Sequence, residues 1–387
     1  MSSFDSETFP QLMDTVERFI RQRLMPLERQ VEEKEEVPAE VIEEMKEMGL
    51  FGLGIPEAYG GCELDLMQEL QVQMAFSYTS PAFRLVFWPN VGIGSKGLVL
   101  AGTEAQKRKY LPGLASGELR AAFCLTEPDA GSDAASLKTR AERDGDMLVI
   151  NGTKRFITNA TRANVFTVMA RTDPSRPGAA GISAILVDRD TPGLHVGKSE
   201  KKLGQRGSPI SDVIFENVRV PVSSVIGGEA ALGQGFRIAM QVLDHGRISV
   251  AASGLGMARR LIDEAARYAV QRKQFGQPIS EFQLVQAMLA DSETEYLAGH
   301  ALVMQAGQAL ARGEDVRNQA AAAKYFCSEA LSRIADRALQ IHGGSGYVAE
   351  HHVERLYRDA RALRIYEGTS QVLQLVIART MLKRYQD

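Results

Sequence analysis

The chain has 387 residues, of which 44% are apolar and 24% are charged. These fractions are typical of a soluble globular protein, so they exclude a disordered chain and a coiled-coil rod. The 45 basic and 48 acidic residues leave a net charge of −3, which gives no overall electrostatic basis for nucleic acid or an anionic membrane as main partner. A chain of this length predicts two or three domains.

The three cysteines, Cys62, Cys124 and Cys327, lie far apart and form no CxxC pair. They favour a reducing compartment over a disulfide framework or a cysteine metal site. The acidic start of the sequence lacks the basic and apolar regions of a targeting signal, and no apolar run approaches the roughly 18 residues of a membrane span. We therefore expect a cytoplasmic protein, or an organelle protein already trimmed, that is not bound to a membrane.

Apolar residues recur at helical spacing through most of the first third of the chain. This pattern predicts a helix over residues 7–35 and a second one over 38–49, with a proline in its first turn. Further helices are expected over 65–78 and 91–102. The glycines of 113–117 are interpreted as the linker out of this part.

The middle third has the composition of β-strands. Residues 147–158 contain an Asn-Gly pair at 151–152 between two β-favouring runs, which predicts a hairpin. Further short strands are expected over 165–170, 182–187 and 213–220. Several short strands in about 110 residues indicate a small barrel or sandwich.

The last third returns to helical periodicity, over 236–268, 282–312, 316–342 and 370–384. Long helices with short loops predict an antiparallel bundle. The expected fold is thus a multidomain α+β protein, with a helical domain over 1–118, a β-barrel or sandwich domain over 119–228 and a four-helix bundle over 229–387.

Common catalytic signatures are missing from the sequence, which has no Walker-type phosphate loop, HExxH helix or GxSxG elbow. Gly254 and Gly256 lie inside a helical pattern, so close helix packing explains them better than a nucleotide-binding turn. His351 and His352 cannot share a helix face and have no further ligand at metal spacing, so we predict no metal site.

Three polar segments could carry chemistry, and each also has a plain structural explanation. Residues 122–133 offer hydroxyls and flexible backbone to a polar ring edge and a phosphate, but could form an ordinary turn. The glycines of 341–346 could approach a pyrophosphate or end a helix. Glu367 precedes a helix capped by Thr369 or Ser370, so it could be a carboxylate favoured by the helix dipole or a general base.

Together these segments resemble the acyl-CoA dehydrogenase family over essentially the whole chain. The linker TEPDAGSD at 126–133 is similar to the family's first signature. QIHGGSGY at 340–347 and YEGT at 366–369 are similar to its second, and RKQFG at 272–276 resembles its adenine-binding turn. Gln340 and Glu367 stand at the family's spacing, and the helix–β–helix order matches its three-domain fold.

The resemblance implies FAD bound without a covalent link, in a cleft between the β-domain and the C-terminal bundle. Phe156 takes the position where the family often has a flavin-packing Trp, and Thr158 would bond near the flavin N5. The other residues implied on this side are Phe123, Leu125, Thr126, Gly131, Ser132 and Ile157.

The resemblance also implies that subunits share the cofactor. The FAD of a neighbouring subunit would contact Arg272, Gln274, Phe275, Phe282 and Gln283. Its pocket would be completed from across the interface by Gln340, Ile341, Gly343 and Gly344. Thr369 and Gln371 would return to the first flavin. The implied assembly is a homotetramer, a dimer of dimers.

The implied reaction is the dehydrogenation of an acyl-CoA thioester to a trans-2-enoyl-CoA. Glu367 would remove the α-proton, and its backbone N–H with a ribityl hydroxyl would stabilise the thioester oxygen. The β-hydrogen would leave as hydride to flavin N5, and an electron-transfer flavoprotein would reoxidise the flavin. Gly246 occupies the position where some family members place the base. Further substrate contacts are implied for Ser132, Asp244, Arg247 and Gly368.

The acyl group itself stays open among short or medium, branched and dicarboxylic chains. Arg84 resembles the arginine that binds the distal carboxylate in glutaryl-CoA dehydrogenases; the alternative is a structural ion pair with a helix carboxylate. Ser77 stands where the decarboxylating enzymes tend to carry Glu. Phe87-Trp88-Pro89 is expected to shape the pocket. Two other interpretations remain, a flavin oxidase or monooxygenase on this fold and a catalytically silent scaffold.

Overall fold

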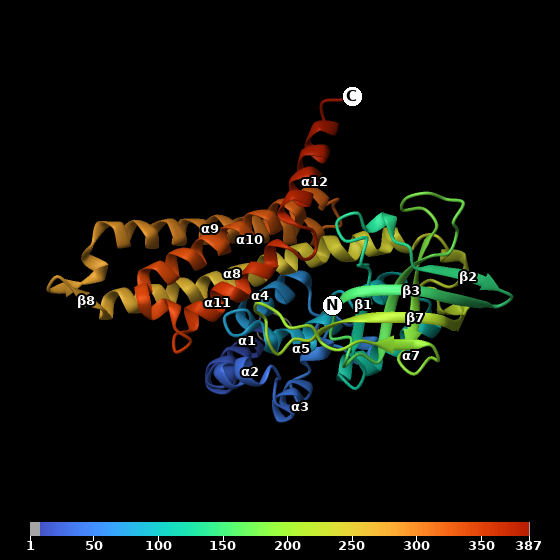
Figure 1. Ribbon diagram of the computed structural model, residues 1–387, viewed down its shortest axis with the longest axis horizontal. Coiled ribbons are helices and arrows are strands. Elements are labelled where there is room, and N and C mark those ends of the chain that lie inside the picture. Colours follow the sequence, from blue (N-terminus) through green and yellow to red (C-terminus); the bar gives the residue numbers. More distant parts are fainter. Residues whose placement is uncertain (1–7, 387) are drawn as a thin grey trace.

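The computed structural model describes residues 8–386 and arranges them as a helical part, a β-sheet and a helical bundle in chain order. The sheet lies at one end of the molecule, and the long helices of the bundle extend side by side away from it (Figure 1). This order confirms the predicted α+β class. The first seven residues, part of the segment in which no targeting signal is expected, lie outside the described residues.

The N-terminal part is built from short helices. They are α1 (Thr8–Phe19), α2 (Glu28–Lys34), α3 (Ala39–Glu47), α4 (Leu66–Phe76), α5 (Pro81–Val91), α6 (Lys96–Ala101) and α7 (Glu104–Ser116). The helix predicted over 7–35 is divided into α1 and α2 by a π-helical stretch (Ile20–Leu24) and a 3₁₀ turn (Met25–Leu27). The division falls at Pro26, which lacks the N–H that a regular helix needs.

Two helices of this part were not predicted, and the linker prediction was wrong. Residues 113–116 belong to α7, which ends only at Gly117 with φ +79°. The second half of α5 includes Pro89, a residue that usually ends a helix. The helix expected over 91–102 is present in its second half only, as α6.

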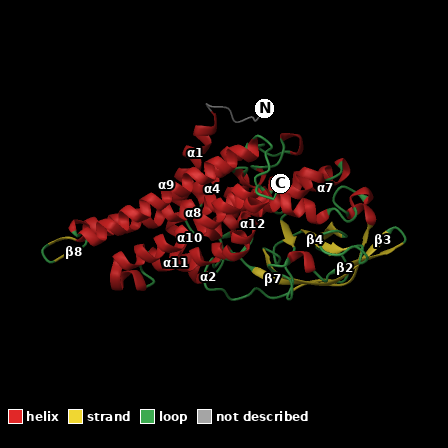
Figure 2. Ribbon diagram, turned by 90° about the horizontal axis from the view of Figure 1, so that it is seen from above, coloured by secondary structure: helices red, strands yellow, loops and turns green. Residues whose placement is uncertain are grey.

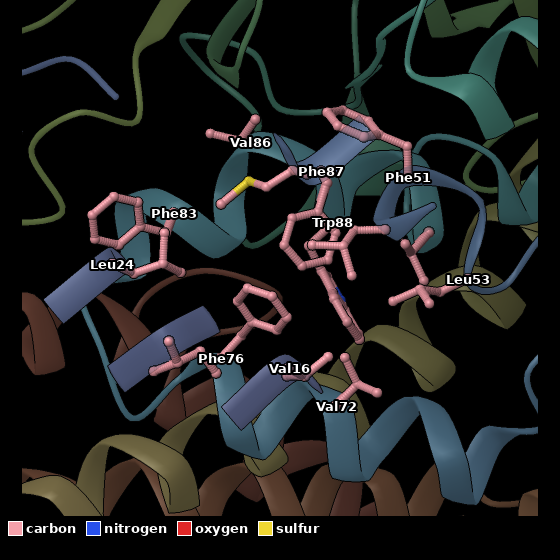
Figure 3. Close-up of a cluster of buried hydrophobic side chains, with 14 of the residues drawn as sticks. Val16, Leu24, Phe51, Leu53, Val72, Phe76, Phe83, Val86, Phe87 and Trp88 are labelled. Carbon is pink, nitrogen blue, oxygen red and sulfur yellow. The ribbon is translucent and has the colours of Figure 1, made fainter. Parts of the chain in front are cut away.

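An aromatic core holds the N-terminal helices together. Phe87 packs edge-on against Phe76, with ring centroids 4.8 Å apart, and against Phe51 at 6.2 Å (Figure 3). These rings are fully buried among aliphatic side chains of α1, α4 and α5. Burial of side chains this large gives the core most of its stabilisation.

The middle part is one seven-stranded sheet with strand order β1-β4-β2-β3-β7-β6, and β5 pairs with β4. Because β4 pairs with three strands, the sheet curls around its own core. The strands are β1 (Ala121–Cys124), β2 (Arg140–Asp144), β3 (Met147–Thr158), β4 (Val165–Arg171), β5 (Ile182–Asp188), β6 (Leu194–Val196) and β7 (Ile210–Pro221).

The hairpin predicted at Asn151-Gly152 is wrong. Residues 147–158 form the single strand β3, which pairs with both β2 and β7. The chain reverses instead at Gly145, with φ +61°, between β2 and β3. Gly152 lies at an irregularity of the β3–β7 pairing, and a Cβ on it would overlap with Thr139. Its role is therefore close packing inside the sheet.

The C-terminal part is a helical bundle, as predicted, with one further short helix. Its helices are α8 (Gly235–Gln271), α9 (Gln283–Ala311), α10 (Arg317–His342), α11 (His352–Ala360) and α12 (Ser370–Lys383). A small hairpin of β8 (Lys273–Gln274) and β9 (Gln277–Pro278) joins α8 to α9. Helix α8 also packs against α4, where a Cβ on Gly256 would overlap with the Met74 carbonyl. This contact confirms the packing interpretation for Gly256.

Candidate active site

The loop before α12 carries the predicted base. Glu367 and Gly368 have φ of +53° and +98°, so two consecutive residues adopt left-handed backbone. Glycine tolerates this conformation, whereas it is uncommon for glutamate and marks a constrained position. Thr369 then caps α12, since its Oγ1 accepts a hydrogen bond from the Val372 N–H at 3.3 Å. Of the two predicted caps, Thr369 is confirmed.

The carboxylate of Glu367 lies against α8 at Gly246. A Cβ on Gly246 would be 3.0 Å from the Glu367 Cδ and would overlap with its Oε2. No described residue donates a hydrogen bond to this buried Oε2. Burial raises the pKa of Glu367 to about 7, opposed by the positive charges of Arg247, Lys324 and Arg84. Such a carboxyl group can exchange a proton near neutral pH.

Arg84 of α5 is buried beside the same loop. It hydrogen-bonds with the Tyr366 side chain, and the negative charge of Glu367 also acts on it. Its Nε has no hydrogen-bond partner, and no described carboxylate lies within ion-pair distance of its guanidinium. The alternative of a structural ion pair with a helix carboxylate is therefore wrong for residues 8–386.

Gln73 of α4 and Ser77, the residue that caps the end of this helix, face α8. Gln73 Nε2 donates to the Ser249 carbonyl at 3.2 Å and also bonds with Ser253, while its Oε1 has no partner among the described residues. One turn later, the buried Ser77 Oγ also lacks a described partner. Ser77 lies next to Gly256, where an added Cβ would be 2.7 Å from the Ser77 Cβ. Unsatisfied polar atoms of this kind are costly unless a ligand or water meets them.

The segment Phe87-Trp88-Pro89 only partly meets its expected role. Phe87 lies in the aromatic core rather than at the site (Figure 3). Trp88 points to α8, where its Nε1 donates to the Ser249 Oγ at 2.9 Å. Arg84 and Trp88 are four residues apart on α5, so they share the helix face that meets the site.

The predicted substrate contacts Asp244 and Arg247 lie on α8 next to Gly246. Arg247 Nη1 binds the Asp244 carboxylate at 2.7 Å, and Arg247 Nε lies 3.4 Å from the Glu367 carbonyl oxygen. Gly368 belongs to the same loop and Gln371 to the first turn of α12. The structure thus brings Glu367, Gly368, Arg84, Asp244 and Arg247 together.

The residues predicted for the flavin on the sheet side form a second group. The loop after β1, which includes Leu125, is tied to β3 because the Arg155 N–H donates to the Thr126 carbonyl at 2.8 Å. Phe156 has φ +58° and is 52% exposed, at an irregularity of the β3–β7 pairing. The neighbouring Ile157 points into the sheet core, so only its backbone is available to a ligand. Phe123 lies on β1 and Thr158 ends β3.

A buried ion pair supports that loop. Lys154 Nζ binds the Glu127 carboxylate at 2.7 Å and the Leu125 carbonyl at 3.2 Å. Glu127 also accepts hydrogen bonds from the N–H groups of Lys138 and Thr139, at 2.6 and 2.9 Å. The loop therefore has a fixed base and an exposed tip, at which Gly131 and Ser132 lie.

The remaining predicted cofactor residues lie at the far end of the bundle. Phe275, 94% exposed with φ +52°, sits in the β8–β9 turn, 6.0 Å from the Phe282 ring. Both views place β8 at the opposite end of the molecule from the sheet (Figures 1 and 2). Arg272 and Gln274 belong to this turn, and Gln283 opens α9. They do not meet the sheet-side residues within one chain.

The end of α10 is also remote from the base loop. Gln340 and Ile341 lie in its last turn, which Gly343 ends with φ +58°, so the helix-end explanation for this glycine holds. Gln340 is 16 residues beyond Lys324, or roughly 24 Å along the helix. Gly343 and Gly344 have open space where a Cβ would stand, which leaves their backbone accessible.

These residues fit FAD. Phe156 offers a half-exposed aromatic ring for a flat ring system, and the open backbone of Gly131 can approach a phosphate tail. Phe156 and Thr158 would hold the ring system, and the loop tip at Gly131 and Ser132 would hold the phosphates.

Sequence reasoning missed three residues of the site, namely Gln73, Lys324 and Tyr366. Gln73 and Lys324 interrupt the apolar faces of α4 and α10, and a polar residue at a buried helical position was the available signal. Tyr366 belongs to the YEGT motif and has no separate sequence signal.

Neither of the two adjacent histidines belongs to a metal site. No group of His, Cys, Asp or Glu among residues 8–386 could hold a metal ion. His352 lies 3.5 Å from the Glu28 carboxylate, and His351 packs edge-on against Tyr268. In the same part of the chain, no helix is both long and apolar enough to span a membrane.

Three family models match the chain in order. They describe the acyl-CoA dehydrogenase N-terminal domain over residues 6–118, the middle domain over 122–218 and the C-terminal domain over 233–382.

Curated relatives cover nearly the whole chain. A 3-(aryl)acrylate reductase of Clostridium sporogenes is 43% identical, over 94% of this chain and 96% of its own. The caffeyl-CoA reductase-Etf complex subunit CarC of Acetobacterium woodii is 41% identical, over 92% and 93%.

Solved structures agree with these relatives. Butyryl-CoA dehydrogenase of Megasphaera elsdenii has a TM-score of 0.93 at 34% identity, covering 99% of this chain and all of its own. Glutaryl-CoA dehydrogenase of Mycobacterium smegmatis has a TM-score of 0.91 at 31% identity, covering 98% and 96%. The resemblance seen in the sequence motifs is confirmed, and the chain belongs to the acyl-CoA dehydrogenase family of FAD-dependent oxidoreductases that act on CH–CH bonds.

Proposed function

We propose that the chain interconverts an acyl-CoA thioester and its trans-2-enoyl-CoA, with Glu367 as the general base. The observation that carries the proposal is the buried Glu367 carboxylate, which has a free Oε2 and a pKa raised to about 7. An α-hydrogen beside a thioester is only weakly acidic, so its removal needs a carboxylate that is close and poorly solvated.

The groups around Glu367 have complementary roles. Gly246 leaves the space that the carboxylate fills. The Glu367 N–H is available to the thioester oxygen, where negative charge develops as the α-proton leaves. Asp244 and Arg247 would meet the CoA end of the substrate, and Ser132 its pantetheine side. FAD, when bound, supplies the hydride acceptor for the β-hydrogen.

The direction of the reaction depends on the electron partner. An electron-transfer flavoprotein is proposed as that partner, supported by a relative whose name places it in an Etf complex. Two relatives carry reductase names. In the reductive direction the protonated Glu367 would return the α-proton, and a pKa near 7 suits both directions.

For the substrate, we propose an acyl group with a carboxylate at its far end. Arg84 is a buried cation without an ion-pair partner among the described residues. A buried cation of this kind is costly unless an anion meets it. The Gln73 side chain meets Ser249 of α8, and its Oε1, which lacks a partner among the described residues, adds a polar group there.

The proposal is tested by anaerobic titration with butyryl-, octanoyl-, isovaleryl- and glutaryl-CoA while the flavin absorbance is followed. We expect bleaching that Glu367→Gln abolishes, fastest with glutaryl-CoA. Arg84→Met should lose the preference for glutaryl-CoA over butyryl-CoA but retain bleaching by butyryl-CoA.

Other outcomes would overturn these proposals separately. A yellow protein that no acyl-CoA reduces would favour the oxidase or monooxygenase alternative, and a colourless one that takes up no FAD would favour the scaffold. Bleaching in Glu367→Gln would remove Glu367 as base. If Arg84→Met keeps the wild-type preference among the esters, the proposal of a substrate with a carboxylate at its far end is wrong.

A further inference from the structure

Helix α10 contributes a buried lysine to the base loop. Lys324 has no solvent-exposed surface, and its Nζ donates to the Gly368 carbonyl at 2.6 Å. No described carboxylate lies within ion-pair distance of it, although Glu367 and Glu329 act on it with their charges. Lysine is rarely buried this completely without a pairing partner, so its position calls for an explanation.

A second cation acts on the adjacent peptide group. Arg247 of α8 approaches the Glu367 carbonyl at 3.4 Å, while its other end is held by Asp244. Two successive carbonyls of the loop, those of Glu367 and Gly368, therefore each face a positive side chain. The left-handed conformation of Glu367 is unfavourable and persists only when its surroundings impose it. The two cations contact this turn from two different helices, α8 and α10.

The same cations act on the carboxylate. Glu367 is faced by Arg247 of α8, Lys324 of α10 and Arg84 of α5, and each favours its charged form. Lys324 is itself faced by Arg247, Glu329 and Glu367, and burial lowers its pKa to about 8. At neutral pH Lys324 is therefore still mainly cationic.

We infer that Lys324 is a positioning residue for the base: its bond to the Gly368 carbonyl fixes the Glu367 turn, and its positive charge stabilises the ionised carboxylate. The inference rests on the proposed role of Glu367. Lys324, which lies 43 residues before Glu367 in the chain, would then help to set the pH range over which the base works.

The test measures proton removal apart from the redox step. The holoenzyme is incubated in D2O with an acyl-CoA analogue that has sulfur in place of the β-carbon, so that it has no β-hydride to lose. Deuterium uptake at the α-carbon is followed across pH 5.5 to 9. In Lys324→Met we expect the midpoint to rise by about one pH unit, so that exchange at pH 6 falls about tenfold.

Three further variants separate charge from hydrogen bonding. Lys324→Gln can still donate to Gly368 but should share the raised midpoint, whereas Lys324→Arg keeps the charge and should keep the wild-type midpoint. Arg333→Gln removes one positive charge from a half-exposed position of the same helix, paired with Glu295 at 2.6 Å, and should not move the midpoint.

A readout independent of turnover accompanies these assays. Carbodiimide labels protonated carboxyl groups, so peptide mass spectrometry of Glu367 labelling against pH gives its pKa directly. The inference is overturned if the Lys324 variants lose α-carbon exchange equally at every pH while the midpoints of exchange and of Glu367 labelling do not move. Lys324 would then have only a structural role. If Lys324→Met does not fold, the midpoints of Lys324→Gln and Lys324→Arg are compared to test the role of the positive charge. A wild type that exchanges no α-proton defeats the proposed function, and the labelling series still tests Lys324.

Discussion

At the scale of single residues, the site depends on one complementary pair. The carboxylate of Glu367 fills the space that a side chain at position 246 would need, so a base can stand at only one of these positions. Glycine at 246 therefore leaves room for the carboxylate of the proposed base and is not only a small residue in a helix.

This complementarity predicts that Gly246→Ala is far more damaging than an alanine usually is in a helix. The added methyl group would push the Glu367 carboxylate away, and a displacement of about 1 Å at a reacting group can cost about a hundredfold in rate. The measurement is the rate of anaerobic flavin reduction. Gly254→Ala, on the same helix, is the matched control, since its Cβ would lie 3.5 Å from the Cys327 carbonyl oxygen. Equal rates in the two variants would contradict the argument.

The raised pKa of Glu367 predicts a stability effect with a definite sign. Because the pKa of Glu367 is higher in the folded state, ionisation of this carboxyl group destabilises the folded state. This destabilisation is absent below about pH 4.5 and complete above about pH 7. Glu367→Gln should therefore be more stable than the wild type at pH 8, by on the order of 2 kcal/mol, and the difference should shrink towards pH 5.

Thermal unfolding of the holoprotein at several pH values measures this difference. Glu69→Gln provides a control of opposite sign. Lys96 and His245 lower the pKa of Glu69 to about 2, so its stabilising contribution is complete at pH 5 to 8. That variant should be destabilised throughout this range, and a Glu367→Gln curve that runs parallel to it would refute the burial argument.

The sequence could predict some of these residues and not others. The YEGT segment left Glu367 open between a helix-dipole carboxylate and a base. Its burial and left-handed backbone support the proposed base, and neither can be predicted from this segment alone. For Lys324, the interruption of an apolar helix face was the available signal, but its contact with the Gly368 carbonyl was not predictable, because the two residues are 44 positions apart.

At the scale of elements, the loop between β1 and β2 is held in place by one buried ion pair, between Lys154 and Glu127. Lys154→Met would leave Glu127 charged, buried and unpaired, which typically costs 3–5 kcal/mol. We expect a loss of that order in the free energy of unfolding, together with faster loss of FAD on dialysis.

Lys138→Met is the matched control for this prediction. Lys138 pairs with Asp129 at 2.9 Å on the exposed side of the same loop. Exposed ion pairs of this kind contribute little to stability, so denaturant unfolding should show little change. If both variants unfold alike and retain FAD alike, the buried pair does not support the loop.

Helices and strands were predictable where the hydrophobic periodicity continues over a long segment. They were missed where the segment is short or the pattern is misleading. The bundle helices follow the pattern because each presents a continuous apolar face. The Asn-Gly pair misled because Gly152 serves close packing against Thr139 and not a turn. Helix α7 did carry a usable signal, the Thr103–Gln106 capping box, whereas the clash that Gly152 avoids appears only once the sheet is assembled.

At the scale of the whole molecule, the predicted cofactor residues lie at two distant ends. Phe156 and Thr158 belong to the sheet, whereas Phe275 and Gln340 belong to the far part of the bundle (Figure 1). The near-complete exposure of the Phe275 ring is unfavourable for a monomer and is typical of a surface that a partner covers. Sharing of FAD between two copies, like the domain division at 118 and 228, stays a prediction.

Shared sites predict complementation between two inactive variants. Glu367→Gln lacks the base but keeps an intact bundle end, while Arg272→Ala with Phe275→Ala keeps the base but damages that end. In a mixed dimer, the Glu367→Gln copy would supply the missing contacts to its partner's site. Random pairing of equal amounts gives about half mixed dimers with one complete site each, so about a quarter of wild-type activity should return.

The measurement is acyl-CoA-dependent flavin reduction by the two variants co-expressed with different affinity tags, compared with each variant expressed alone. Double-tag purification isolates assemblies that contain both variants, and their activity should exceed that of either parent because each mixed dimer in them has one complete site. Mixing the purified variants without subunit exchange is the control and should restore nothing. If the isolated mixed dimer is as inactive as its parents, each chain must hold its FAD alone, and the bundle end would need another explanation for its exposed aromatic ring.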